Sequence, residues 1–221
     1  MQVTHVLLSM IQLFLKGGPI MWPILVTSII ALTVVLERLI FIVRENVKRQ
    51  PQVVGEILAR VETGDLDGAV ETGRRSEDFI ARALTYALRN RDKSVSEALL
   101  RAANWELKRF NRGLAILDTV ITLAPLLGLL GTVTGMIHSF GLLGASELGA
   151  PAAITGGIAE ALIATAFGLG VAILAVIPFN FLNARLEEAR QDIQDAASHI
   201  ELCLVKRGAS CAFQTLDTAE V

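Results

Sequence analysis

Charged residues are scarce in this sequence, and their scarcity is the first guide to its class. Of 221 residues, 20 are Lys or Arg and 22 are Asp or Glu, so that 19% are charged. An ordinary soluble domain carries about 25% charged residues. With hydrophobic residues at 52%, this composition excludes a disordered tail and a solenoid with a solvated surface.

Motifs of enzymes and permeases are missing as well. The sequence has no G-x-x-x-x-G-K-[ST] motif, which argues against an ATP-driven enzyme, and no internal repeat of the kind found in solute permeases. It has two cysteines, Cys203 and Cys211. Their spacing, with His199 as the one nearby histidine, argues against a metal site. We therefore expect no enzyme activity, no cofactor, no metal and two free thiols.

The charges avoid three long windows altogether. Residues 17–36, 119–146 and 161–184 contain none over 20, 28 and 24 residues. A bilayer core is crossed by about 20 helical residues, whereas a buried helix of a soluble protein gives about 10–14 apolar residues. Each window therefore predicts a membrane-spanning helix. Residues 2–15 are predicted to form an interfacial amphipathic helix, and a non-standard uncleaved start is the alternative.

The distribution of Lys and Arg predicts the orientation in the membrane. Residues 1–19 contain one, the loop 147–156 none, the segment 44–112 fourteen and the segment 185–221 four. By the positive-inside rule, the N-terminus and the loop lie outside, and the two basic segments lie in the cytoplasm, where thiols stay reduced. Eleven acidic residues in 44–112 nearly balance the basic ones, which argues against nucleic-acid binding.

The segment 44–112 has the pattern of several short helices. Thr63 and Gly64 interrupt a pattern with a period of 3.6 residues, and Asp65 can cap the next helix. Further along, Ser94 and Glu97 form a capping box, which predicts the start of another helix.

Two long helices are expected to follow from the remaining pattern. If Gly113 is accommodated, the helix after the capping box runs over 95–140 and is about 69 Å long. The third span continues without a clear stop until Gly208, and Pro178 should kink it. Both helices would then project together into the cytoplasm.

The second and third spans each present a face of small residues, and the second also has a polar face. On a helix with 100° per residue, the polar face lies within about 80° and contains Asp118, Thr122, Pro125, Leu129, Thr132 and Met136. The small faces contain Ala124, Gly128, Gly131 and Gly135 in the second span, and Gly157, Ala161, Ala164, Gly168, Ala172 and Ala175 in the third. Small residues allow close helix packing in lipid.

Each polar residue also has a purely structural interpretation. A threonine in a membrane helix commonly bonds a carbonyl of its own helix, and Asp118 can reach water at the end of its span. A functional role is favoured for Thr122 and Thr132 because they share a face with Asp118. Glu160 stands at the outer end of an apolar helix with no basic residue nearby, so it needs a partner subunit, water or a proton.

Three stretches of this sequence resemble the MotA/TolQ/ExbB proton-channel family, and its ExbB/TolQ branch in particular. Residues 17–23 together with Glu37-Arg38-Leu39 resemble the first span of that family and its exit. Residues 124–137 resemble its second-span signature, and residues 157–169 resemble its third-span signature. One departure is Gly156-Gly157, where the family commonly has Pro-Gly; this loosens the entry to the third helix.

The resemblance implies a ring of five copies of this chain around the single spans of two ExbD/TolR-like chains. Proton flow would drive rotation and mechanical work on a TonB- or TolA-like protein that spans the periplasm. Thr132 and Thr165 would line the proton path, with Thr122 and Asp118 along it, and Glu160 would act in gating or assembly. The titrating aspartate would belong to the partner chain.

Together these features predict an all-α integral membrane protein of the bacterial inner membrane. We expect three transmembrane helices, two of them extended into a cytoplasmic helical bundle, and the resemblance implies a ring-forming homo-oligomer. The expected parts are an interfacial helix (1–16), three transmembrane helices (17–43, 113–141 and 155–184), a cytoplasmic helical domain (44–112), a periplasmic loop (142–154) and a cytoplasmic extension with the tail (185–221). A non-conducting membrane scaffold is the alternative function.

Overall fold

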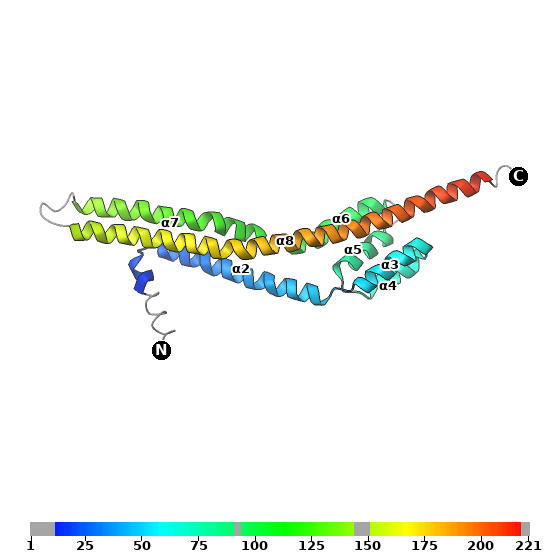
Figure 1. Cartoon of the computed structure of the whole chain (residues 1–221), viewed down its shortest axis with the longest axis horizontal. Coiled ribbons are helices and arrows are strands. Elements are labelled where there is room, and N and C mark those ends of the chain that lie inside the picture. The colour runs from blue at the N-terminus through cyan, green and yellow to red at the C-terminus, as the bar shows by residue number, and fades with distance from the viewer. Residues whose placement is uncertain (1–11, 91–93, 144–150, 218–221) are drawn as a thin grey trace. The chain divides into compact units, whose positions relative to one another are not determined.

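The computed structural model describes residues 12–90, 94–143 and 151–217, and all regular elements in these stretches are α-helices (Figure 1). This confirms the all-α class for the described residues. A short helical segment at 12–16 comes first. The longer helices are α2 (Met21–Val47), α3 (Pro51–Thr63), α4 (Leu66–Arg74), α5 (Phe79–Arg89), α6 (Val95–Asn111), α7 (Leu114–Leu143) and α8 (Pro151–Asp217).

Three helices are long and apolar enough to cross a membrane: Met21–Val47, Leu114–Gly141 and Thr155–Val205. They overlap the three charge-free windows and confirm the number of predicted spans. The first helix begins at Met21 rather than at residue 17, because residues 17–20 form a turn in which Gly18 has a φ of +73°. The predicted interfacial helix and the predicted loop 142–154 fall largely outside the described residues.

The chain divides into two compact units. The first unit consists of Met1–Arg38 and Gly113–Leu182, and it contains α7, most of α2 and the first part of α8. In Figure 1, α7 lies along this part of α8. Met21, Ile24 and Ala164 form its small buried cluster, against which Leu127 and Phe167 pack. Leu114, Leu117, Val120 and Leu182 are also buried in this unit.

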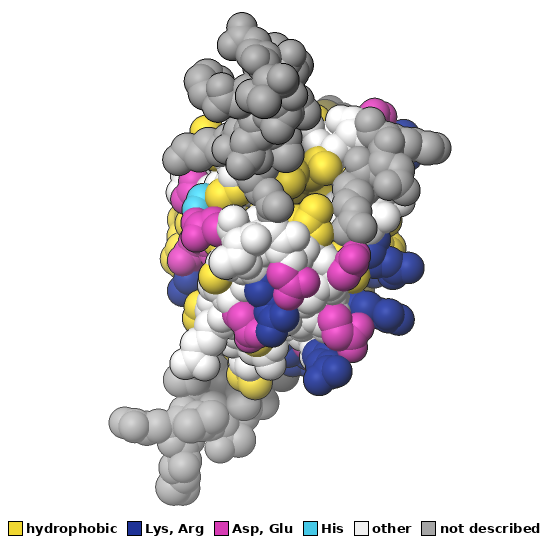
Figure 2. Space-filling model, turned by 90° about the vertical axis from the view of Figure 1, so that its right-hand side faces the viewer, with side chains coloured by type: hydrophobic (Ala, Val, Ile, Leu, Met, Phe, Trp, Pro, Cys, Tyr) yellow, Lys and Arg dark blue, Asp and Glu magenta, His cyan; other side chains and the backbone are white. Residues whose placement is uncertain are grey.

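The second unit consists of Leu39–Arg112 and Asn183–Val221. Its hydrophobic core takes buried side chains from α3, α5, α6 and the later part of α8, among them Ile57, Val61, Ile80, Leu84, Leu88, Leu99, Ile193 and Ile200. Its outer surface is charged, and Figure 2 shows acidic and basic side chains interspersed on one face. Buried apolar side chains with a charged exterior are what a water-exposed helical unit requires.

Helix caps in the second unit follow the sequence pattern. Gly64, with a φ of +88°, ends α3, and the Asp65 carboxylate accepts a hydrogen bond from the Gly68 N–H at 2.9 Å. Ser94 caps α6 by accepting a bond from the Glu97 N–H at 3.3 Å. Both predicted caps are confirmed, because each side chain satisfies a backbone donor left free at a helix start.

The predicted continuous helix over 95–140 is wrong. Helix α6 ends at Asn111, Arg112 is extended, and Gly113 has a φ of +83° before α7 begins. A side chain at Gly113 would lie 2.9 Å from Val34 Cγ1, so glycine suits both the conformation and the space. By contrast, α8 is longer than predicted: it includes Pro178 and passes Gly208 to end at Asp217.

Candidate functional site

The small-residue faces of α7 and α8 lie against each other in the first unit. A methyl group added to Gly131 would lie 2.6 Å from Cβ of Ala164, and one added to Gly135 would lie 2.9 Å from Cβ of Ala161. Both distances are too short for two carbon atoms in contact. The two helices therefore approach closely only because these positions lack larger side chains.

Two further glycines bring one backbone onto the other. A methyl group on Gly128 would lie 3.0 Å from Cα of Thr165, and one on Gly168 would lie 2.5 Å from the carbonyl oxygen of Ala124. These residues complete an antiparallel series that we call the small-residue ladder: Ala124, Gly128, Gly131 and Gly135 on α7, with Gly157, Ala161, Ala164 and Gly168 on α8.

Thr165 makes a hydrogen bond between helices in the middle of this ladder. Its hydroxyl lies 2.8 Å from the carbonyl oxygen of Gly128 and 3.3 Å from that of Ala161 in its own helix. The shorter contact identifies the Gly128 carbonyl as the main acceptor. In an α-helix that carbonyl also accepts the N–H of the residue four positions later, which is Thr132. Thr165 and Thr132 thus meet at one carbonyl, the first through its side chain and the second through its backbone.

The rest of the predicted polar face points away from the ladder. Thr132 is partly buried as a residue, and its hydroxyl donates to the Leu129 carbonyl at 2.7 Å in an exposed bond. The Thr122 hydroxyl donates to the Thr119 carbonyl at 2.9 Å, and Asp118 is exposed. Backbone bonds of this kind satisfy a threonine proton but leave the oxygen lone pairs free to accept another bond. Among the described residues, Asp118, Thr122, Leu129 and Met136 of this face are exposed.

Glu160 lies on the turn that begins the first membrane helix. A methyl group built on Gly18 would overlap the Glu160 carboxylate, and Gly18 has a φ of +73°. The first-span and third-span signatures therefore meet at this point. Sequence reasoning did not foresee this contact, although the Gly-Gly pair at 17 and 18 is the kind of signal that marks a left-handed turn or a close approach.

Two buried polar residues accompany this arrangement. Ser139 is 1% exposed, donates to the Gly135 carbonyl at 2.8 Å and fills the space over Gly157. Arg38 is 3% exposed and forms an ion pair with Glu37 near the end of the first unit.

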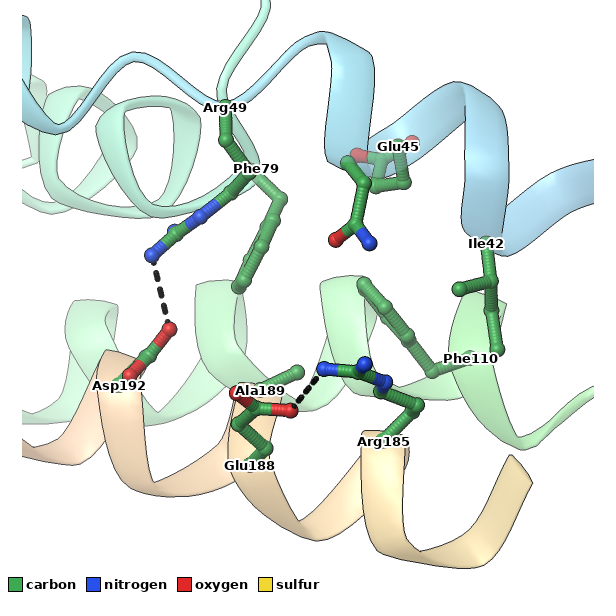
Figure 3. Close-up of a pocket in the computed structure, with 10 residues that line it drawn as sticks. Ile42, Glu45, Arg49, Phe79, Phe110, Arg185, Glu188, Ala189 and Asp192 are labelled. Carbon is green, nitrogen blue, oxygen red and sulfur yellow. Dashed lines mark hydrogen bonds and ion pairs between the residues drawn. The ribbon is translucent and has the colours of Figure 1, made fainter. Parts of the chain in front are cut away.

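The second unit contains a small charged pocket of about 90 Å³. Figure 3 shows Arg49 beside the ring of Phe79, with its guanidinium carbon 4.8 Å from the ring centroid, and paired with Asp192 at 2.8 Å. Arg185 pairs with Glu188 at 2.7 Å, and both residues belong to α8, as Asp192 does. The pocket has room for a few water molecules rather than for a substrate. It contains no group poised for covalent chemistry.

A second ionic cluster joins α2, α5 and α6 within the same unit. The Arg82 guanidinium lies 2.9 Å from Glu45 and 2.8 Å from Glu106, and Arg109 lies 2.7 Å from Glu106. Hydrogen bonds with Glu106 raise the pKa of Arg82 well above its usual value. Burial alone would raise the pKa of Glu106, but hydrogen bonds from Arg82 and Arg109 outweigh burial and hold that pKa below its usual value. Both pKa shifts favour the charged forms of Arg82 and Glu106.

Residues 73–195 match the MotA/TolQ/ExbB proton channel family. The putative biopolymer transport protein ExbB-like 1 of Synechocystis is 41% identical over 197 residues, which cover 86% of this chain and 76% of that protein. The putative biopolymer transport protein ExbB homolog of Methanothermobacter thermautotrophicus is 32% identical over 84% of this chain and 67% of that protein. The Tol-Pal system protein TolQ of Haemophilus influenzae is 39% identical over 45% of this chain and 44% of that protein.

Proposed function

We propose, because the chain belongs to the MotA/TolQ/ExbB proton channel family, that it is the channel-forming subunit of an ExbB/TolQ-type energy-transducing complex. It would convert the proton motive force into mechanical work. The observation that carries this proposal is the small-residue ladder with Thr165 at its centre. The ladder lies inside the residues matched by the family, and it combines close helix packing with hydroxyl groups in an otherwise apolar unit.

In this proposal the chain lies in the bacterial inner membrane and crosses it three times. The N-terminus and the connection between α7 and α8 would lie outside, and the second unit would lie in the cytoplasm. The charged outer surface of that unit supports its placement in water rather than in lipid, since an unpaired charge in lipid is costly. The fourteen basic residues of 44–112 support it by the positive-inside rule.

The proposed assembly is a ring of five copies around two ExbD/TolR-like chains, which pass force to a TonB- or TolA-like protein. The three charge-free windows provide no carboxylate in the middle of the membrane, so the titrating acid would come from the partner. A potential of 100 mV supplies about 2.3 kcal/mol for each proton that crosses. That energy is released only if the protein offers a continuous polar path.

Thr132 and Thr165 are proposed to line this path, with Thr122 and Asp118 leading towards the cytoplasmic side. Through its lone pairs, a hydroxyl group accepts a hydrogen bond from a protonated water or from the partner's carboxylic acid. It holds no fixed charge that would trap the proton. The Gly128 carbonyl accepts a bond from the Thr165 hydroxyl and, by helix geometry, from the Thr132 backbone N–H, so the two threonines adjoin each other at this point of the proposed path.

The test is proton flux into proteoliposomes that contain the chain together with its partner. Replacement of both Thr132 and Thr165 by Val removes two hydroxyls and keeps the side-chain shape. We expect the flux to fall by about tenfold to a hundredfold, the cost of losing hydrogen bonds to a charged group. Assembly should persist, because the Gly128 carbonyl keeps its helical partner.

Thr33→Val is the matched control, since Thr33 also bonds its own helix, at Ile29, on the exposed side of α2. Its flux should equal that of the unchanged protein. Full flux in the double variant would refute the pore assignment. Absence of flux from the unchanged complex, with assembly intact, would favour the non-conducting scaffold.

A further inference from the structure

Three metal-ligating side chains meet in the second unit, away from the small-residue ladder. Glu62 comes from α3, and His199 and Cys203 come from the later part of α8. One carboxylate oxygen, one imidazole nitrogen and the thiol sulfur all lie within 4.8 Å of one another. The His199 Nε2 lies 2.9 Å from the Glu62 Oε1.

The backbone holds these side chains in place. His199 and Cys203 are four residues apart on one helix, so their side chains lie on the same face, one turn from each other. Val61 and Ile200, which adjoin Glu62 and His199 in sequence, are both 0% exposed and belong to the core of the unit. Helices α3 and α8 are therefore fixed against each other at the level of the cluster.

The ion pair between Glu62 and His199 accounts for two of the three groups. It does not account for the thiol beside them. Cys203 packs against the edge of the core and is a free thiol. Glu62 and His199 are 53% and 44% exposed, which leaves the cluster open to an ion from solvent.

The spacing of the two cysteines argues against a metal site, but it does not include Glu62, which packing brings from α3. We propose that Glu62, His199 and Cys203 form a binding site for one divalent transition-metal ion of the zinc class. Thiolate, imidazole and carboxylate are all established zinc ligands, and three protein ligands plus one water complete a tetrahedral shell. Calcium and magnesium prefer sites made entirely of oxygen, so a sulfur and a nitrogen donor select against them. The histidine and the cysteine come from α8 and the carboxylate from α3, so a bound ion joins the two helices.

Binding requires modest movements and a balanced exchange of protons. Zinc bonds are about 2.0–2.3 Å long, so the carboxylate and the imidazole separate slightly to admit the ion between them. The Cys203 thiol loses its proton to solvent and binds as thiolate, and His199 binds in its neutral form. Since the ligands lie on two helices, the ion should stabilise the folded unit whenever it is bound.

The experiment is a Co²⁺ and Zn²⁺ titration of the untagged, reduced full chain in detergent. Co²⁺ bound to a thiolate gives a charge-transfer band in the near ultraviolet and visible bands characteristic of tetrahedral geometry. We expect one ion per chain, displacement of Co²⁺ by Zn²⁺, and a raised thermal unfolding midpoint with Zn²⁺. Magnesium at the same concentration should neither displace Co²⁺ nor raise the thermal unfolding midpoint.

Variants separate this site from other metal-binding groups. Cys203→Ser should abolish the charge-transfer band, whereas Cys211→Ser should keep it. His199→Ala and Glu62→Gln should each weaken binding by about tenfold or more, and His138→Ala, on α7, should leave it unchanged. All five side chains are replaced by smaller or similar ones, and circular dichroism checks that each variant remains helical.

Two results would overturn the proposal. One is a charge-transfer band that survives Cys203→Ser or disappears in Cys211→Ser, since either outcome would show that Cys203 is not the thiolate ligand. The other is equal affinity in the unchanged chain and in His199→Ala and Glu62→Gln, which would reduce the cluster to an ion pair beside a thiol.

Discussion

At the scale of single residues, Gly18 sets the position of Glu160. It has a φ of +73°, and an added methyl group would overlap the Glu160 carboxylate. Gly18→Ala should therefore strain the turn by about 1–2 kcal/mol and displace the carboxylate. We expect a lower thermal unfolding midpoint and a loss of proton flux in the reconstituted complex, both measured against the unchanged protein.

Gly156→Ala is the control for this prediction. Gly156 lies one turn before Glu160 on α8, and an added methyl group meets nothing within 4 Å. It should retain flux and gain slightly in stability, because alanine favours a helix. Equal flux in Gly18→Ala and the unchanged protein would show that the position of Glu160 does not affect transport. A loss shared by Glu160→Gln would assign the effect to the charge of Glu160.

Much of this site could be predicted from residue spacing, but its contacts could not. The helical period separates a polar face from a small-residue face on α7, and the structure places the small face against α8. The period cannot show that Thr165 uses its hydroxyl to bond Gly128 or that Glu160 lies on Gly18. These pairs join segments far apart in the sequence, and only packing brings them together.

At the scale of helices, Glu106 connects α6 to α5 through Arg82. Glu106 has a side chain only 7% exposed, and Arg82 and Arg109 both bond it. Glu106→Gln should leave Arg82 and Arg109 to share one carboxylate, that of Glu45. We expect the free energy of unfolding to fall by about 1–3 kcal/mol at neutral pH, which is the cost of an unsatisfied buried polar or charged group. The fall should lie towards the low end of this range because the Arg82 side chain is 30% exposed.

The pH dependence of that loss follows from the direction of the pKa shift. The pKa of Glu106 is below its ordinary value of 4.5 in the folded state, because Arg82 and Arg109 bond its charged form despite the opposing effect of burial. Its contribution to stability is therefore complete above about pH 4.5 and declines as the pH falls through the folded pKa. Thermal unfolding at neutral and acidic pH should show the difference between Glu106→Gln and the unchanged protein shrinking with acid.

Glu97→Gln on the same helix is the control. Glu97 is 68% exposed, and its contact with Arg101 is 3.6 Å long, so its replacement should change stability little at either pH. A Glu106 variant as stable as the Glu97 variant would show that the cluster is held by apolar packing alone.

The helices themselves illustrate what local sequence determines. The ends at Gly64 and Ser94 were predictable because each depends on one residue and its immediate neighbours. The break at Gly113 was not, because a lone glycine is tolerated within a helix at a cost of about 1 kcal/mol. The need for glycine at this break comes from Val34, which leaves no room for a side chain at residue 113. Val34 is far away in the sequence, so the local pattern does not reveal this constraint.

At the scale of the whole molecule, most of the polar face of α7 is exposed in the part of the chain that the structure describes. Asp118 and Thr122 are exposed on α7, beside exposed apolar residues such as Leu126, Leu129, Val133 and Met136. The apolar residues suit lipid, whereas exposed polar groups in a membrane need a partner or water. The small-residue ladder is already used within the chain, so further copies must approach through these other faces. A closed ring would place the polar face towards a shared centre.

The number of subunits tests this arrangement directly. Native mass measurement of the chain in detergent, alone and with an ExbD/TolR-like partner, should give five copies in both cases and two partner chains in the second. The Thr132→Val and Thr165→Val double variant should give the same masses, because both positions keep their shape and the ladder is intact. Its loss of flux would then be a loss of conduction and not of assembly. A monomer or a dimer under both conditions would contradict the ring and leave Asp118 and Thr122 facing lipid, an arrangement that membrane energetics disfavours.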